Sequence, residues 1–396
     1  MNVRLLLPLI VFIDIAFLLF SISNISISYH EAEIFFDQKN FIHFIAHLST
    51  TLFGQNDFAL RLPFVLFHVG SIILIYKIST FYLKRELDRI MSVLVFVMLP
   101  GVTSAAILVN SATVSIFFTL LFLYFFLNKK ENSYALLLPL LVFIDDSFII
   151  LYLSLFVYGF MKKEHFITVM SFFLILVSLY IYGFDMTNDP KVYFFNVFAV
   201  YAAIFSPFLF LYFFYVQYRI FIKGEKSIIW YISFTALVLS ILLSFRKMIL
   251  IEDFAPFVVI ATPLMYAVFI RSYRIRLPEL RGTHRFVFAF TFGTLIAIFA
   301  LAHLNKYLYL YIDKPSKHFA YKYHVAKELA KKLKDDGINE VLINHKMQKR
   351  LRFYGISEGN RYIINDIAGA DKAKSVTISY FNTPIKTFYV SKIHKK

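Results

Sequence analysis

The stretch Leu5–Asn24 reads LLLPLIVFIDIAFLLFSISN, and a short loop separates it from Tyr29-His30-Glu31-Ala32-Glu33-Ile34-Phe35. An apolar run of about 20 residues is long enough to cross a bilayer as a helix. The carboxylates that follow would then lie at a membrane surface, where a carboxylate can act as a general base or hold a metal. Glu31 and Glu33 are therefore candidate catalytic residues, and ordinary solvated loop acids are the alternative.

Composition places the chain among membrane proteins. Hydrophobic residues make up 59% of it, charged residues 17%, and the mean hydropathy is +0.67, more apolar than a soluble core requires. The chain contains no cysteine, which excludes disulfides, thiolate metal sites and cysteine nucleophiles. From Asn305 onward 19 basic residues face 8 acidic ones. After a membrane domain, such a tail indicates anionic lipid head groups or acidic substrates and not nucleic acid.

Eleven apolar segments predict an all-α polytopic membrane domain over residues 1–304, with about eleven transmembrane helices. The region Tyr134–Met161 is divided in two, because one long helix would place Asp145 and Asp146 near the bilayer centre at high cost. The segments are Leu5–Asn24, Leu62–Tyr82, Ile90–Ala106, Val109–Leu127, Tyr134–Ile144, Phe148–Met161, Phe166–Phe184, Val192–Gln217, Ile228–Phe245, Phe254–Ile270 and Phe286–Leu304.

Loop charge predicts the orientation of these segments. With eleven spans, sixteen basic residues collect on one side of the membrane and five on the other. Because basic loops stay in the cytoplasm, the N-terminus is predicted to be cytoplasmic. The loop that begins near Tyr29 and the tail after Leu304 are then predicted to be extracytoplasmic.

The tail, residues 305–396, is predicted to be a small extracytoplasmic α/β domain. Its first helical pattern stops at Asp335-Asp336-Gly337, since glycine commonly follows the end of a helix. The predicted helices are Tyr323–Lys334 and Met347–Tyr354, and the predicted strands are Glu340–Ile343, Tyr362–Ile364, Val376–Tyr380 and Lys386–Val390.

Two apolar stretches, residues 41–52 and Leu5–Asn24, contain polar side chains that need a separate interpretation. Residues 41–52 have the spacing of a helix that lies in the membrane interface. His43 and His47, four apart on it, are either interfacial polar residues or part of a metal site. Asp14 lies inside the first apolar segment, and a hydrogen bond to a neighbouring helix near His68 is favoured over direct chemistry.

Several short motifs in the first part of the chain resemble those of bacterial GT-C glycosyltransferases. They are His30-Glu31-Ala32, Leu52-Phe53-Gly54 and Phe58-Ala59-Leu60-Arg61-Leu62-Pro63, in this order and spacing. Within that superfamily the chain is most similar to the protein O-mannosyltransferase and lipid A aminoarabinose transferase group. The similarity is clear over residues 1–165 and vaguer to Leu304.

The resemblance implies an inner-membrane enzyme that moves a sugar from a polyprenyl-phosphate donor to an acceptor lipid, glycan or protein outside the cytoplasm. Glu31 matches the glutamate of the family's Asp-Glu-Ala, whereas His30 stands where the family has its aspartate. Lys39-Asn40-Phe41 and Ser111-Ala112-Thr113 also depart from the family's His-Pro-Pro and Pro-Asp-Ala. Glu31, His30 and Glu33 are therefore the predicted catalytic residues.

Basic residues on the predicted outer side are candidates for the donor's phosphate. Arg246 and Lys247 are adjacent there, and anchoring at the membrane interface is their alternative role. Arg61 directly precedes the second segment, and arginine can hold a phosphate with two hydrogen bonds. Asp145 and Asp146 are candidates for a divalent cation at that phosphate, or else a solvated turn.

Two other functions stay open from the sequence. One is a transporter or flippase of lipid-linked sugars, in which Asp14, His68 and Lys77 would line the pathway. The other is a catalytically inactive relative that scaffolds envelope assembly. The large interfacial loop and the tail domain favour an enzyme.

Overall fold

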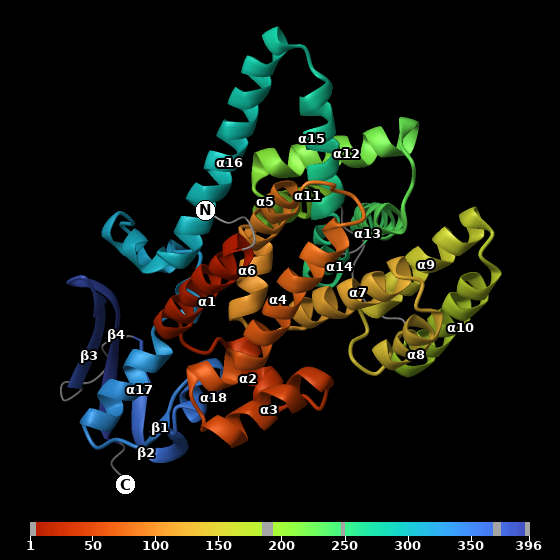
Figure 1. The fold of residues 1–396 in the computed structure, drawn as a ribbon. Helices are drawn as coiled ribbons and strands as arrows, with labels where there is room; N and C mark the ends of the chain where they lie inside the picture. The colour runs from red at the N-terminus through yellow and green to blue at the C-terminus, as the bar shows by residue number, and fades with distance from the viewer. Residues whose placement is uncertain (1–4, 184–192, 247–249, 367–373, 393–396) are drawn as a thin grey trace. The chain divides into compact units, whose positions relative to one another are not determined.

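The computed structural model describes residues 5–183, 193–246, 250–366 and 374–392, whose fold is shown in Figure 1. Short 3-10 turns lie at Pro278–Leu280, Asn305–Leu310, Pro315–Lys317 and Tyr321–Tyr323. The helices up to His303 are α1 (Leu6–Asn24), α2 (Tyr29–Phe36), α3 (Phe41–Phe53), α4 (Asp57–Ser79), α5 (Glu86–Val97), α6 (Pro100–Ile107), α7 (Ser111–Leu127), α8 (Glu131–Leu141), α9 (Phe148–Lys162), α10 (His165–Tyr182), α11 (Phe194–Phe205), α12 (Pro207–Lys223), α13 (Ile228–Ser244), α14 (Ile251–Val259), α15 (Thr262–Ile275) and α16 (Arg281–His303).

These helices confirm the predicted class, a mostly helical multi-pass membrane domain followed by a small sheet domain. Each of the eleven predicted segments falls on one helix or on a bent pair of helices within the described residues. By length and composition, four helices there can cross a membrane, or seven if each bent pair is one span. The count stays below eleven because α7, α8, α9 and α13 have only 11 to 17 residues. At 1.5 Å per residue they reach less than the roughly 30 Å of a hydrocarbon core.

Three segments predicted as single helices are bent pairs. The bends are 63° between α5 and α6, 106° between α11 and α12, and 46° between α14 and α15. In each pair the second helix has a proline, Pro100, Pro207 or Pro263, at one of its first two positions. Proline fits the first turn of a helix but cannot continue one, so it ends the preceding helix. The predictions of unbroken helices there were wrong for this reason.

The division of Tyr134–Met161 into two helices is confirmed. α8 ends at Leu141, α9 begins at Phe148, and Asp145 and Asp146 lie in the turn between them. The Tyr152 hydroxyl donates a hydrogen bond of 2.9 Å to the carbonyl oxygen of Leu138, which ties the two helices together.

The chain forms two compact units. Unit 1 is Met1–Ala16, Phe64–Ala106 and Asn110–Ala302, and its core of buried Phe, Leu, Ile and Val side chains runs through α5, α7, α9, α13, α14 and α15. Unit 2 is Phe17–Pro63, Ile107–Val109 and His303–Lys396. The loop after the first apolar segment therefore packs with the tail. The division into domains at Leu304 and Asn305 stays a prediction.

Unit 2 contains the predicted α/β fold. Its tail helices are α17 (Ala326–Asp335) and α18 (His345–Phe353), and its strands are β1 (Glu340–Leu342), β2 (Ser357–Asn365), β3 (Lys374–Tyr380) and β4 (Thr383–Lys392). The sheet order is β1-β2-β4-β3, with β1 parallel to β2 and the other pairs antiparallel. Figure 1 shows α18 beside α2, which comes from the far end of the chain. This pairing brings the predicted catalytic loop onto the tail.

Candidate functional site

The candidate site is built around the first turn of α2. The hydroxyl of Ser28 accepts a hydrogen bond of 3.2 Å from the backbone N–H of Glu31, and Oε2 of Glu31 accepts one of 2.8 Å from the backbone N–H of Ser28. This reciprocal pair is a capping box, which satisfies two backbone donors at the start of a helix. The cap fixes the Glu31 carboxylate against the beginning of α2.

Arg61, one turn after the start of α4, makes an ion pair with that carboxylate. Its Nη2 lies 3.1 Å from both oxygens of Glu31, and its Nε lies 3.2 Å from Oε1. The backbone N–H of Val109 donates a further hydrogen bond of 3.1 Å to Oε1. Glu31 is 2% exposed and Arg61 is 0% exposed, so this is a buried pair in which each charge depends on the other.

Asp57 extends the pair toward the tail. Its Oδ1 lies 3.4 Å from Nη1 of Arg61, and its Oδ2 lies 2.9 Å from Nζ of Lys327. The Tyr354 hydroxyl donates to Asp57 at 2.8 Å and accepts from the backbone N–H of Ile27 at 2.9 Å. Burial raises the pKa of Tyr354, and the Asp57 carboxylate raises it further, so the phenol stays protonated and remains a donor.

This geometry bears on the predicted role of Glu31. A general base needs an oxygen within hydrogen-bond reach of the acceptor. Both Glu31 oxygens already accept from Arg61 and from backbone N–H groups, and Arg61 is equally surrounded. In this conformation Glu31 and Arg61 organise the site. Catalysis by Glu31 and phosphate binding by Arg61 stay predictions.

The other two predicted catalytic residues are more open. His30 is exposed and Glu33 is half-buried, on the same helix as Glu31. Glu33 accepts a hydrogen bond of 3.3 Å from the Tyr29 hydroxyl, and His30 lines a cleft of about 400 Å³ in unit 2. His30 and Glu33 are therefore the predicted catalytic side chains that an acceptor can approach.

The remaining phosphate and metal candidates lie in unit 1. Arg246 is exposed just after the end of α13, and Lys247 lies outside the described residues. Asp145 is half-buried and accepts a hydrogen bond of 2.5 Å from the Ser147 hydroxyl, and Asp146 is exposed. Burial raises the pKa of Asp145 to about 6. Within the described ranges, no three His, Asp or Glu residues gather in a way that could hold a metal ion.

The histidine pair on α3 has a structural role. Nδ1 of His43 lies 3.1 Å from the carbonyl oxygen of Ile34, and Nε2 of His47 lies 2.7 Å from that of Phe35. A carbonyl only accepts, so each of these ring nitrogens carries its proton. The two imidazoles thereby satisfy carbonyls at the end of α2 that have no helical partner.

The exposed surface of α3 agrees with a position in the membrane interface. Phe44, Leu48 and Leu52 are 50% to 68% exposed and four residues apart, so they form one apolar stripe. Gly54 ends the helix with a φ of +83°, a conformation that glycine adopts without strain. An apolar stripe of this kind is stabilised when it meets lipid.

The expected partner of Asp14 is confirmed. Nε2 of His68 lies 2.9 Å from Oδ2 of Asp14, and both side chains are buried in unit 1. Lys77 is exposed near the end of α4, and its ammonium stands 5.2 Å from the centre of the Tyr124 ring. Pairing within a helix bundle accounts for Asp14 without a transport pathway.

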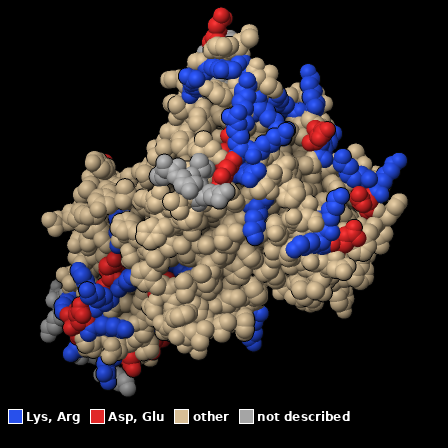
Figure 2. Space-filling view, in the orientation of Figure 1, with Lys and Arg blue, Asp and Glu red and all other residues tan. Residues whose placement is uncertain are grey.

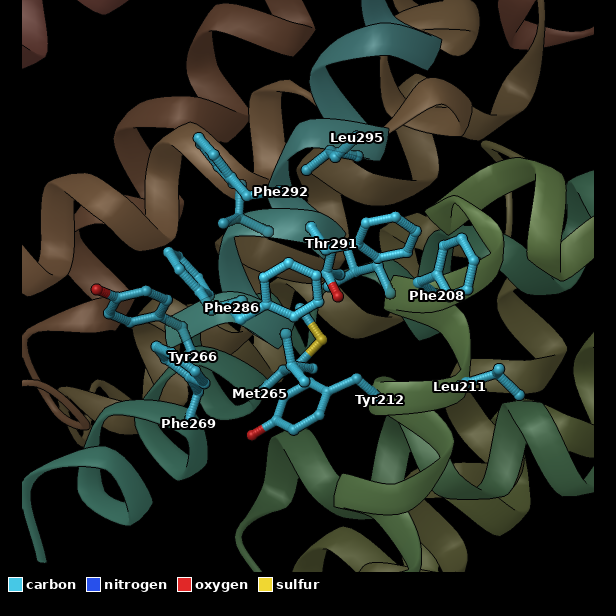
Figure 3. A pocket seen from close by; sticks show the side chains of 15 residues that line it. Phe208, Leu211, Tyr212, Met265, Tyr266, Phe269, Phe286, Thr291, Phe292 and Leu295 are labelled. Carbon is cyan, nitrogen blue, oxygen red and sulfur yellow. The ribbon is translucent and has the colours of Figure 1, made fainter. Parts of the chain in front are cut away.

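Unit 1 contains an apolar cavity of about 410 Å³ between α12, α15 and α16. In Figure 3 the labelled side chains from these helices surround one space, and the oxygen atoms among them are the hydroxyls of Tyr212, Tyr266 and Thr291. None of the described residues that line it is charged. A cavity of this composition favours a hydrocarbon chain over a polar ligand.

Comparison with known proteins identifies the fold. No protein-family model and no curated protein sequence matches the chain. The crystal structure of ArnT from Cupriavidus metallidurans bound to undecaprenyl phosphate superposes with a TM-score of 0.53 and 12% identity, over 88% of this chain and 74% of that one. The apo structure of ArnT superposes with a TM-score of 0.52 and 12% identity, over 96% and 97% of the two chains. The chain has the fold of ArnT. ArnT is a lipid A aminoarabinose transferase of the GT-C class, the group that the sequence motifs resemble.

Sequence reasoning missed several members of the site. The spacing Ser28-x-x-Glu31 is a capping-box signature and would have assigned Glu31 to the start of a helix. Asp57, which bonds Arg61, Tyr354 and Lys327, had no local signal. Arg61 is only four residues away on α4, but Lys327 and Tyr354 lie about 270 and 300 residues further along the chain, and only folding brings them to Asp57.

Proposed function

We propose that the protein is a membrane glycosyltransferase that takes a sugar from a polyprenyl-phosphate-linked donor. The observation that carries this proposal is the likeness of the fold to ArnT over 88% and 96% of the chain. One of those ArnT structures holds undecaprenyl phosphate, which is a lipid phosphate of the kind that the proposed donor would release. The acceptor is a lipid, glycan or protein on the outer side of the cytoplasmic membrane.

The apolar cavity of unit 1 supports a lipid donor. Its walls are aromatic and aliphatic side chains of α12, α15 and α16 (Figure 3), so a hydrocarbon chain can move into it from the bilayer without the cost of burying a polar group. The exposed Arg246 belongs to the same unit and stays the described candidate for the donor's phosphate. Lys247 is the proposed second cation.

The α2 loop is the proposed catalytic element. His30 or Glu33 would accept the proton of the acceptor hydroxyl while its oxygen attacks the sugar carbon that bears the phosphate. The bond from that carbon to the phosphate oxygen then breaks, and polyprenyl phosphate leaves with the electron pair. Glu31, held by Arg61 and by its capping box, keeps the helix in place for this step.

Contacts within unit 1 support the proposed orientation. Arg274 pairs with Asp88 at 2.7 Å, and Arg271 donates a hydrogen bond of 3.3 Å to the carbonyl oxygen of Tyr82. These contacts join the basic loop before α5 to the basic end of α15, as expected if both face the cytoplasm. Figure 2 shows basic side chains gathered over the part of unit 1 that contains the ends of α12, α15 and α16.

The activity is tested in membrane vesicles with labelled polyprenyl-phosphate sugar. We expect transfer of the label by the natural protein, and loss of transfer with unchanged unfolding temperature in His30→Ala or Glu33→Gln. Movement of the lipid-linked sugar across the membrane without transfer would favour a transporter. Binding of the donor without either reaction would favour an inactive relative, and both results would overturn the proposal.

The orientation is tested on the same vesicles by cysteine labelling. Because the chain contains no cysteine, single substitutions are the only reactive thiols. Lys129→Cys, in a predicted cytoplasmic loop, is expected to resist an impermeant reagent added outside right-side-out vesicles, whereas Lys314→Cys in the tail is expected to react. The reverse pattern would refute the orientation.

A further inference from the structure

Unit 2 contains a polar cleft of about 400 Å³ to which the proposed reaction assigns no ligand. Its walls come from the start of α2, the segment before α17, the helix α18 and the strand β4. Ser28, Tyr29 and His30 form one side of it. The cleft is therefore next to the proposed catalytic helix.

The floor of the cleft carries a buried arginine without a carboxylate partner. Arg350 is 7% exposed and donates to three neutral oxygens among the described residues: the carbonyl of Ile27 at 2.7 Å, the hydroxyl of Ser26 at 3.1 Å and the carbonyl of His324 at 2.9 Å. Its other terminal nitrogen, Nη1, has no hydrogen-bond partner in the part of the chain that the structure describes. A buried guanidinium in this state is costly unless an anion approaches it.

A second buried group on the floor has an unused polar atom. His324 is 1% exposed, and its Nδ1 lies 2.8 Å from the Tyr309 hydroxyl. Its Nε2 is buried and has no hydrogen-bond partner in the described ranges. Burial lowers the pKa of His324 to about 3, so the ring is neutral at physiological pH and carries one proton. If the Tyr309 hydroxyl donates to Nδ1, Nε2 is a donor.

The rim adds positive charge. Lys322 and Lys346 are exposed lining residues with no carboxylate partner in the described residues. Lys386 also lines the cleft and pairs with Asp366 at 2.8 Å. With Arg350, four cations face one carboxylate, and a concave site with this imbalance attracts anions. Tyr29, Tyr321 and Phe388 supply aromatic walls against which a sugar ring can pack.

We propose that this cleft binds an oxyanion group, phosphate or carboxylate, carried on the acceptor saccharide. Arg350 and the lysines at the rim hold the anion, and the bound saccharide lies beside His30. That the bound saccharide is the acceptor rests on the proposed transferase function. Binding of the anion in the cleft does not depend on that function. A neutral sugar lacks the group that Arg350 requires and binds weakly.

Direct binding to the full chain tests the proposal, in nanodiscs of zwitterionic lipid and without donor. The probes are inorganic phosphate, glucuronate and glucose, measured by calorimetry at two salt concentrations. Phosphate and glucuronate are expected to bind at least about ten-fold more tightly than glucose, and less tightly at high salt. Equal affinity for glucuronate and glucose, or an affinity for phosphate that salt does not change, would overturn the proposal.

Rim variants keep the test independent of folding. Lys322→Gln and Lys346→Gln remove exposed charges and are each expected to weaken phosphate binding about three- to ten-fold. Lys314→Gln, an exposed lysine of the same unit that does not line the cleft, is the matched control and is expected to change nothing. An equal effect of all three variants would show a general charge effect and would overturn the site.

Two further arms separate the sources of the anion and the two proposals. Vesicles with anionic lipid that displace neither phosphate nor glucuronate support a saccharide ligand, whereas binding to such vesicles alone would show a membrane contact and overturn it. Binding of the anion without sugar transfer would refute the proposed transferase activity and leave the proposed anion site supported. If the protein binds no anion and its transfer activity is unchanged by Lys322→Gln and Lys346→Gln, the proposed anion site is refuted. The proposed transferase activity would then still stand.

Discussion

The Glu31–Arg61 pair allows a sharp test of whether Glu31 is a structural or a catalytic residue. Glu31→Gln replaces one carboxylate oxygen by an NH2 group. In either orientation the new NH2 faces Nη2 of Arg61 and one backbone N–H, of Ser28 or of Val109. That backbone N–H loses its acceptor, whereas Nη2 of Arg61 keeps the remaining oxygen but loses the negative charge that pairs with it.

The magnitude follows from those contacts. An unsatisfied buried donor costs about 1–3 kcal/mol, and more when it is charged. Arg61 keeps Asp57 at 3.4 Å and the carbonyl oxygen of Ser26 at 3.3 Å, which limits the loss. We therefore expect Glu31→Gln to lower the free energy of unfolding by about 3–5 kcal/mol, the range for breaking a buried pair.

The assay is unfolding in mixed micelles, followed by circular dichroism, with limited proteolysis of unit 2 as a second readout. Glu33→Gln is the matched control, because among the described residues this half-buried side chain accepts a single side-chain hydrogen bond, of 3.3 Å from the Tyr29 hydroxyl. It is expected to change stability by less than about 0.5 kcal/mol. A Glu31→Gln protein as stable as the natural one but without transfer activity would refute the structural role and show that Glu31 is catalytic.

Three other predictions concern the same two units. Tyr354→Phe removes a hydroxyl that donates to Asp57 and accepts from a backbone N–H, so we expect a loss of about 1–3 kcal/mol in the same unfolding assay. Because burial raises the pKa of Asp145 to about 6, the folded state binds its proton more tightly than the unfolded state, and stability falls as the pH rises from about 4 to 6. Asp145→Asn should therefore gain at most about 3 kcal/mol at pH 8 and nothing at pH 4, with Asp146→Asn as the exposed control. Burial lowers the pKa of His324 to about 3, so the unfolded chain binds a proton at a higher pH than the folded chain does. Unit 2 therefore loses stability as the pH falls from about 6.5 toward 3. His324→Phe should flatten this dependence of stability on pH, and an unchanged dependence would contradict the prediction.

Much of the fold was readable from local patterns. The apolar segments, the turn at Asp145-Asp146 and the helices and strands of the tail depend on composition and period over about ten to twenty residues. The stop after α17 was also local: Gly337 adopts a φ of +71°, and its N–H donates to the carbonyl oxygen of Lys334 at 2.9 Å. The bends at Pro100, Pro207 and Pro263 were missed, although each proline is visible in the sequence.

The candidate site was only half readable. The sequence singled out Glu31, His30 and Arg61, and folding brought Glu31 and Arg61 together in one buried pair. It did not indicate that Tyr354 and Arg350 would pack against this segment, because no periodicity links residues about 300 positions apart. The resemblance of the motifs predicted a catalytic role for Glu31. In the structure Glu31 is buried, and both of its carboxylate oxygens accept hydrogen bonds from Arg61 and from backbone N–H groups.

By itself the sequence determined that this protein is a helical membrane protein with an acidic loop and a basic α/β tail. Hydropathy and charge act within a segment, so they need no knowledge of distant partners. Only the tertiary structure decided that the loop and the tail form one unit, that Glu31 is engaged while His30 and Glu33 are open, and that Arg350 lies buried beside a cleft. Those facts depend on which side chains exclude water from one another, and that is settled by packing across the whole chain.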